Sequence, residues 1–179
     1  MTGTQVALLR GINVGRAKRV AMADLRVIVA ELGYGNVRTL LNSGNVVYTA
    51  PGVAPAKAAA RIERALVERL GISSRVTVLT ASELAAVVAE NPLHTVARDP
   101  SRLLVTVLTN PGDRARLEPL ERQDWAPERL ALGRRVAYLW CPEGLLAGRL
   151  PEAVGRVLGD AATTRNWATV TKLHALAEA

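Results

Sequence analysis

The chain has 179 residues, 49% of them hydrophobic, with a single cysteine and two histidines. This length can bury one large core or two small ones, whereas the cysteine and histidine counts exclude an internal disulfide and leave no zinc ligand set. The formal charge of +7 is concentrated near the N-terminus, because residues 1–50 hold six basic and two acidic side chains against 17 and 14 in the remainder.

The first predicted element is a strand at about residues 6–12, followed by a basic loop that contains glycine. The apolar run before Arg10 is too short for a signal peptide, and no stretch approaches the roughly 20 apolar residues of a membrane-spanning helix. A lone cysteine also suits a reducing compartment. We therefore expect a cytoplasmic protein with no membrane partner.

The first half of the chain then alternates helices and strands. Apolar residues at helical spacing predict two helices that end at Gly33 and Gly71, and β-rich runs around an Asn-Ser-Gly turn predict a hairpin. The predicted elements are a helix at 22–32, strands at 36–41 and 45–49, a helix at 55–70 and a strand at 75–79. Their order, with the first strand, is βαββαβ.

The second half is predicted to repeat most of that order. A helix at 82–90, capped by Ser82, leads into it. Its elements are a strand at 103–108, a helix at 113–124, strands at 129–132 and 136–140, and helices at 145–158 and 166–177. The sequence thus predicts an α+β protein of two subdomains, the first ferredoxin-like (βαββαβ) and the second a related βαββαα arrangement packed on it. We place these subdomains at residues 1–97 and 98–179.

The ferredoxin-like order predicts that two loops meet at one edge of the first sheet. Its first and second strands run in the same direction with the third between them, so the basic loop lies beside the hairpin turn at 42–45. Glycine-bent backbone and cations at such an edge suit an anion, although an arginine-rich composition also arises without selection for binding. The candidate anion-binding residues here are Arg10, Gly11, Asn13, Gly15, Arg16, Lys18, Arg19, Ser43 and Asn45.

Several of these residues also have a purely structural interpretation. The glycines suit a turn, and Ser43 and Asn45 suit a tight hairpin, without any ligand. Strand alternation puts Arg10 on the face of Val6 and Leu8. This placement predicts an interior or interfacial side chain that pairs with an external anion or a backbone carbonyl.

A second cluster of donors is predicted at the start of the last helix. Thr164 or Asn166 is placed to cap that helix, and Arg165 and Asn166 are further candidates for anion binding. The neighbouring Trp167 is explained as well by packing as by ligand binding. The cluster would add hydrogen-bond donors to a binding site, but it indicates no particular reaction.

Motifs for common catalytic and cofactor sites are missing. The sequence has no phosphate-binding loop ending in Gly-Lys-Ser/Thr, no nucleophile elbow and no complete dinucleotide fingerprint. Cys141 is interpreted as a core thiol, and His94 and His174 as histidines at the surface or its margin. An RNA-binding module of this order needs aromatic residues on its central strands, where only Tyr48 stands. We therefore expect no cofactor and no metal, and we assign no catalytic residue.

Four segments, LLRGINVGR, RTLLNSGNVVY, NPL and TTRNWATVTKL, occur in this order along the chain. They resemble the successive signatures of a bacterial family of conserved, uncharacterised proteins, domain of unknown function 1697. The resemblance implies a two-part α+β fold with a ferredoxin-like first part, and it brings no reaction or cofactor. Arg16 stands where the family usually has a second glycine, and Leu146–Arg149 where it has a Gly-Arg-Ser-Lys-like turn. The second difference removes hydrogen-bond donors and so disfavours a phosphate-binding site at that turn, whereas Arg16 adds charge to the basic loop.

Three functions are open at this point. The first is binding of a phosphate-bearing partner, either a nucleic-acid backbone or a phosphorylated small molecule, at the basic loop. The second is an enzyme that acts on a small anionic substrate in the cleft between the subdomains, for which the sequence offers no clear general base. The third is a homodimerisation or scaffold module, and the sequence does not define the oligomeric state.

Overall fold

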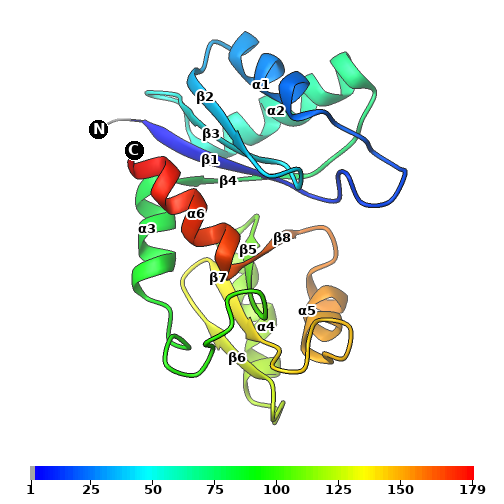
Figure 1. Ribbon diagram of the computed structural model, residues 1–179, viewed down its shortest axis with the longest axis vertical. Helices are drawn as coiled ribbons and strands as arrows, with labels where there is room; N and C mark the ends of the chain where they lie inside the picture. The colour runs from blue at the N-terminus through cyan, green and yellow to red at the C-terminus, as the bar shows by residue number, and fades with distance from the viewer. Residues whose placement is uncertain (1–2) are drawn as a thin grey trace. The chain divides into compact units, whose positions relative to one another are not determined.

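The computed structural model describes residues 3–179, which form two compact units (Figure 1). The first unit runs to Ala85 and also includes Leu173–Ala179, and the second comprises Ala86–Lys172. The end of the chain therefore belongs with its N-terminal half.

A four-stranded antiparallel sheet forms the first unit, in the order β2-β3-β1-β4. Because β1 pairs antiparallel with β3, and β3 with β2, β1 and β2 run in the same direction, as the predicted order requires. The strands are β1 (Thr4–Leu9), β2 (Gly35–Leu40), β3 (Asn45–Thr49) and β4 (Val76–Thr80). The first strand thus ends at Leu9, before the predicted residue 12.

Two helices, α1 (Met22–Glu31) and α2 (Pro55–Leu70), cover one face of this sheet. Proline at its first turn begins α2, and Gly71, with φ of +66°, ends it in the left-handed region that glycine adopts without strain. Alternate strand residues such as Leu9 and Val46 pack on these helices, which places the core of the unit between helices and sheet.

Tyr48 lies inside this core. Its ring stacks on Tyr34 with 5.1 Å between ring centroids, and its hydroxyl donates to Gln5 Oε1 at 3.0 Å. Burial raises the pKa of Tyr48 above its usual value. The aromatic ring that a base would need on the central strands is therefore not accessible.

The helix α3 (Ala81–Ala89) follows β4 directly. Its cap is Thr80 and not the predicted Ser82: Thr80 Oγ1 accepts from the Glu83 N–H at 3.0 Å, and Glu83 Oε2 accepts from the Thr80 N–H at 2.8 Å. This reciprocal pair is a capping box. The helix accordingly starts one residue earlier than predicted.

The second unit has a four-stranded antiparallel sheet in the order β6-β7-β5-β8. A short 3₁₀ turn, η1 (Pro111–Asp113), precedes α4 (Arg114–Glu121), and α4 and α5 (Leu150–Leu158) pack on one face of the sheet to close its core. The strands are β5 (Leu103–Leu108), β6 (Arg129–Leu132), β7 (Val136–Trp140) and β8 (Ala162–Asn166). The unit ends within α6 (Trp167–Glu178), whose residues from Leu173 onward belong to the first unit.

The strand β8 is absent from the sequence prediction. It pairs along β5, with Arg165 opposite Val105, and the hydroxyls of Thr164 and Thr106 are hydrogen-bonded at 2.9 Å. This strand completes a βαββαβ order in the second unit and holds Asn166 at the start of α6.

Within residues 3–179, none of the helices has the length and apolarity that crossing a bilayer demands.

Candidate functional site

The basic loop, residues 10–20, folds back on itself after β1 (Figure 1). The Asn13 N–H donates to Lys18 O at 3.0 Å, and Val14 forms an isolated bridge with Ala17. Gly15, with φ of +63°, allows the turn between these pairs. The loop is therefore a small hairpin with Arg16 near its tip.

Asn13 fixes this loop against the hairpin turn between β2 and β3. Its Nδ2 donates to Val20 O at 2.8 Å and to Asn42 O at 2.7 Å, while its Oδ1 accepts from the Val20 N–H at 2.8 Å. The Leu9 N–H also donates to Gly44 O at 2.9 Å. The two loops that the strand order predicted to meet are thus joined by direct hydrogen bonds.

The turn at residues 42–45 is held from within. Asn45 is fully buried, and its Nδ2 donates to Leu40 O at 2.8 Å and to Ser43 Oγ at 2.9 Å. A Cβ on Gly44 would lie 2.8 Å from Leu9 Cβ, and the φ of +89° there also favours glycine. Asn45 and Asn13 use their amides inside the protein, so their contribution to any site is to position the loops.

Four predicted cations, Arg10, Arg16, Lys18 and Arg19, are exposed on this surface. The predicted interior position of Arg10 is wrong: β1 ends at Leu9, so strand alternation no longer applies to the next side chain. The Arg10 backbone is still fixed, since its carbonyl accepts from Ser74 Oγ at 2.8 Å. We call the surface of residues 10–19 and 42–45 the basic rim. Among residues 3–179, no carboxylate forms an ion pair with Arg16, Lys18 or Arg19.

The second predicted cluster, Arg165 and Asn166, lies in the other unit. Asn166 caps α6, because its Oδ1 accepts from the Thr169 N–H at 2.9 Å. Arg165 is half-buried and donates to Thr164 O at 3.0 Å, and burial lowers its pKa to about 10. The guanidinium stays protonated at neutral pH.

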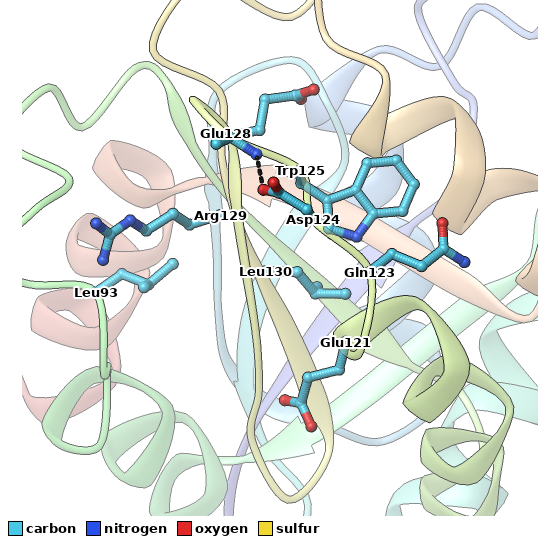
Figure 2. Close-up of a pocket in the computed structure, with 9 residues that line it drawn as sticks. Leu93, Glu121, Gln123, Asp124, Trp125, Glu128, Arg129 and Leu130 are labelled. Atoms are coloured by element: carbon cyan, nitrogen blue, oxygen red, sulfur yellow. Dashed lines mark hydrogen bonds between the residues drawn. The ribbon is translucent and has the colours of Figure 1, made fainter.

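The second unit contains an open pocket of about 430 Å³ that the sequence did not predict (Figure 2). No motif marks it, because its walls come from the end of α4, the following loop, the start of β6 and one residue beyond α3. The lining residues are Leu93, Glu121, Gln123, Asp124, Trp125, Ala126, Glu128, Arg129 and Leu130.

Trp125 is held firmly in the wall of this pocket. Its indole N–H donates to Leu120 O at 2.7 Å, and the guanidinium of Arg149 lies 5.5 Å from the centroid of its ring. This distance is within the range of a cation–π contact. The ring is half-buried and fixed before any ligand arrives.

Glu128 lines the pocket and caps α5. Its Oε1 accepts from the Arg149 N–H at 2.9 Å and its Oε2 from the Leu150 N–H at 3.2 Å. A carboxylate is favoured there because the first N–H groups of a helix lack intrahelical partners. A Cβ on Gly148 would lie 2.9 Å from Glu128 Oε2. The turn at Leu146–Arg149, which differs from the family pattern, is thus bound to Glu128, a carboxylate of the protein itself.

Cys141 is fully buried, which confirms its interpretation as a core thiol. Burial, followed by the charge and hydrogen bonding of Glu128, raises the pKa of the thiol to about 12. His94 is exposed and His174 is half-buried, as predicted. None of these three side chains is arranged as a nucleophile.

Iodoacetamide is expected to leave Cys141 unmodified in the folded protein at about pH 8, because only the thiolate reacts and burial keeps the thiol neutral. The raised pKa contributes stability that is present below the usual thiol pKa of 9 and is lost as the pH rises from there toward 12. Mass spectrometry after timed labelling checks the first point, and urea midpoints of wild type and Cys141→Ala at alkaline pH check the second. Rapid labelling of the folded chain would contradict both.

Comparison with known proteins gives a family and a fold. The family described as "Protein of unknown function (DUF1697)" matches residues 1–138. A solved structure of a conserved bacterial protein from Streptococcus pneumoniae is similar to this chain, with a TM-score of 0.80, 22% identity and coverage of 97% of this chain and 98% of that one. At this identity the similarity shows the fold alone. No curated protein matches the chain.

Proposed function

Since this chain belongs to the DUF1697 family, whose function is unknown, we propose a function from its own geometry: the basic rim binds the phosphate groups of a nucleic-acid backbone. The observation that carries this proposal is the group of exposed cations Arg16, Lys18 and Arg19, which no carboxylate of the described chain neutralises. External phosphates would supply the missing negative charge.

The chemistry of the rim suits phosphate. Guanidinium groups such as those of Arg16 and Arg19 pair with phosphate oxygens through two parallel hydrogen bonds, and Lys18 adds a point charge. The bonds from Asn13 to Val20 and Asn42 hold the loop before binding, which lowers the entropy lost when the partner arrives. A phosphorylated small molecule shares this chemistry and is one outcome of the test below.

A polymer with many phosphates is favoured over a sequence-specific single strand. Tyr48 is buried against Tyr34, so the central strands offer no ring on which a base can stack. The cations are exposed along the basic loop, where an extended polyanion would contact several of them at once. We therefore expect binding that depends on salt and little on base sequence.

The double variant Arg16→Glu/Arg19→Glu is expected to weaken nucleic-acid binding by roughly ten-fold or more at low ionic strength. For every phosphate that the variant no longer neutralises, the slope of log K against log salt should also become shallower by about 1. Fluorescence anisotropy with a labelled DNA duplex and a labelled single-stranded RNA, at about 50 and about 200 mM salt, measures both quantities.

The matched control is Arg98→Glu/Arg122→Glu, which makes the same change in charge at exposed residues of the second unit. Its affinity should stay near that of wild type. Equal weakening by the two double variants would assign the binding to net charge and reject the rim. Absence of binding even at the lower salt would reject the nucleic acid. If nucleotides or sugar phosphates then raise the melting temperature of wild type but not of the rim variant, the partner is a small molecule.

A further inference from the structure

The strand β6 has a free edge next to the pocket. It is the outermost strand of its sheet and pairs only with β7. The Gly133 N–H donates to Val136 O at 2.8 Å, and hydrogen-bonded pairs alternate along an antiparallel ladder. Residues 129 and 131 therefore direct their backbone polar groups toward β7, whereas residues 130 and 132 direct theirs outward.

The outward groups of β6 differ in their partners. The Leu132 N–H, as the alternation requires, is bound from outside, because it donates to Glu121 Oε2 at 3.2 Å. The outward N–H and carbonyl of Leu130, in contrast, form no hydrogen bond with any loop or side chain of residues 3–179. Leu130 also lines the pocket, so this unpaired part of the sheet edge lies beside that space.

The other walls supply apolar surface and negative charge. Trp125 and Leu93 offer apolar area, and Figure 2 shows Arg129 extending toward Leu93 and away from Trp125. Glu121 and Asp124 are exposed, and each gives one oxygen to a backbone N–H, of Leu132 and Ala126 respectively. Each carboxylate keeps a second oxygen with no partner among the described residues. The lining of the pocket therefore carries negative charge at Glu121 and Asp124 that no other described residue neutralises.

We propose that this pocket binds a short extended peptide segment with basic side chains, which adds to the free edge of β6 at Leu130. The peptide backbone would donate to the Leu130 carbonyl and accept from its N–H, as an added strand does. A lysine or arginine of the peptide would meet Glu121 and Asp124, and an apolar side chain would rest on Trp125. The volume of about 430 Å³ lies within the range of ligand pockets.

The test uses the full ¹⁵N-labelled chain and two capped hexapeptides, one alternating valine with lysine and the other valine with glutamate. The lysine peptide is expected to shift the NMR signals of the Leu130 amide and the Trp125 indole with a Kd of about 1 mM or tighter. The glutamate peptide should bind at least about three-fold more weakly, because exposed ion pairs are individually small.

The charge-neutral variant Glu121→Gln/Asp124→Asn keeps oxygen acceptors for the Leu132 and Ala126 N–H groups, and it should abolish the preference for lysine. The control Glu143→Gln/Glu152→Gln removes two exposed charges elsewhere in the unit and should keep that preference. Leu130→Pro, which removes an N–H that β7 does not use, should weaken both peptides.

Equal affinity for the two peptides, or shifts that avoid Leu130 and Trp125, would overturn the proposal. Shifts at Leu130 that depend on protein concentration without peptide would also overturn it, because a second copy of the chain would then occupy the edge. The basic rim variant leaves this pocket untouched, so the result is independent of nucleic-acid binding.

Discussion

Glu128→Ala is expected to destabilise the protein by about 3 kcal/mol, the largest effect we predict for one side chain. The variant leaves the Arg149 and Leu150 N–H groups at the start of α5 without their acceptor, and bonds to a charged group are worth more than neutral ones. It also removes a buried carboxylate that helps to raise the pKa of the Cys141 thiol. Urea unfolding followed by circular dichroism gives the loss of stability.

Two further variants define the cause of this effect. Glu128→Gln keeps an oxygen for one of the two N–H groups and should cost less than Glu128→Ala. Glu143→Ala, at an exposed carboxylate of the same unit, should change stability by no more than about 0.5 kcal/mol. Faster iodoacetamide labelling of Cys141 in Glu128→Ala than in Glu128→Gln, which removes the same charge, would locate the loosening at this site. A Glu128→Ala protein as stable as wild type would show that the buried carboxylate is not needed as a cap.

Asn13→Ala is expected to cost about 2 to 3 kcal/mol and to loosen the basic rim. The variant removes three hydrogen bonds that tie the loop to Val20 and Asn42, and it places alanine at a φ of +55°. Asn13→Gly removes the same bonds but adopts this φ freely, so it should be less destabilising than Asn13→Ala by about 1 kcal/mol. Urea unfolding of the two variants separates the side-chain bonds from the backbone conformation.

The same pair of variants links stability to binding. If the Asn13 hydrogen bonds hold the cations in place before the partner arrives, both variants should bind nucleic acid more weakly while keeping the wild-type salt slope, because no cation is removed. Equal stability of the alanine and glycine variants would mean that the left-handed backbone at residue 13 carries no strain. Wild-type affinity in both would mean that the rim binds without this preorganisation.

The sequence predicted the first unit well because its signals are local. Pro55 and Gly71 mark the two ends of α2 through their own backbone preferences, and the Ser43–Gly44 turn marks the hairpin. Once these elements are placed in order, the strand directions alone bring the basic loop beside the hairpin. The adjacency of the two loops is therefore a consequence of topology and needs no tertiary detail.

Features that depend on distant partners were not predictable. The strand β8 is a polar segment without alternation, and its backbone is satisfied by β5, far away in sequence. The interior position predicted for Arg10 was wrong because β1 ends at Leu9 and the Arg10 side chain is exposed, although the Leu9 and Arg10 N–H groups still donate to Gly44 O and Arg75 O. The internal roles of Asn13 and Asn45 depend on which carbonyls the fold brings within reach of an amide. The pocket around Trp125 likewise arises from segments that carry no shared motif.

The return of Leu173–Ala179 to the first unit means that no single cut divides the chain into its two units. A truncation or proteolytic cleavage after Ala85 yields an N-terminal fragment that lacks Leu173 and Ala177, both of them buried. Such a fragment would expose apolar surface that the intact chain covers. An isolated piece that carries the basic rim therefore needs the last turns of α6, added in trans as a synthetic helix or fused through a flexible linker.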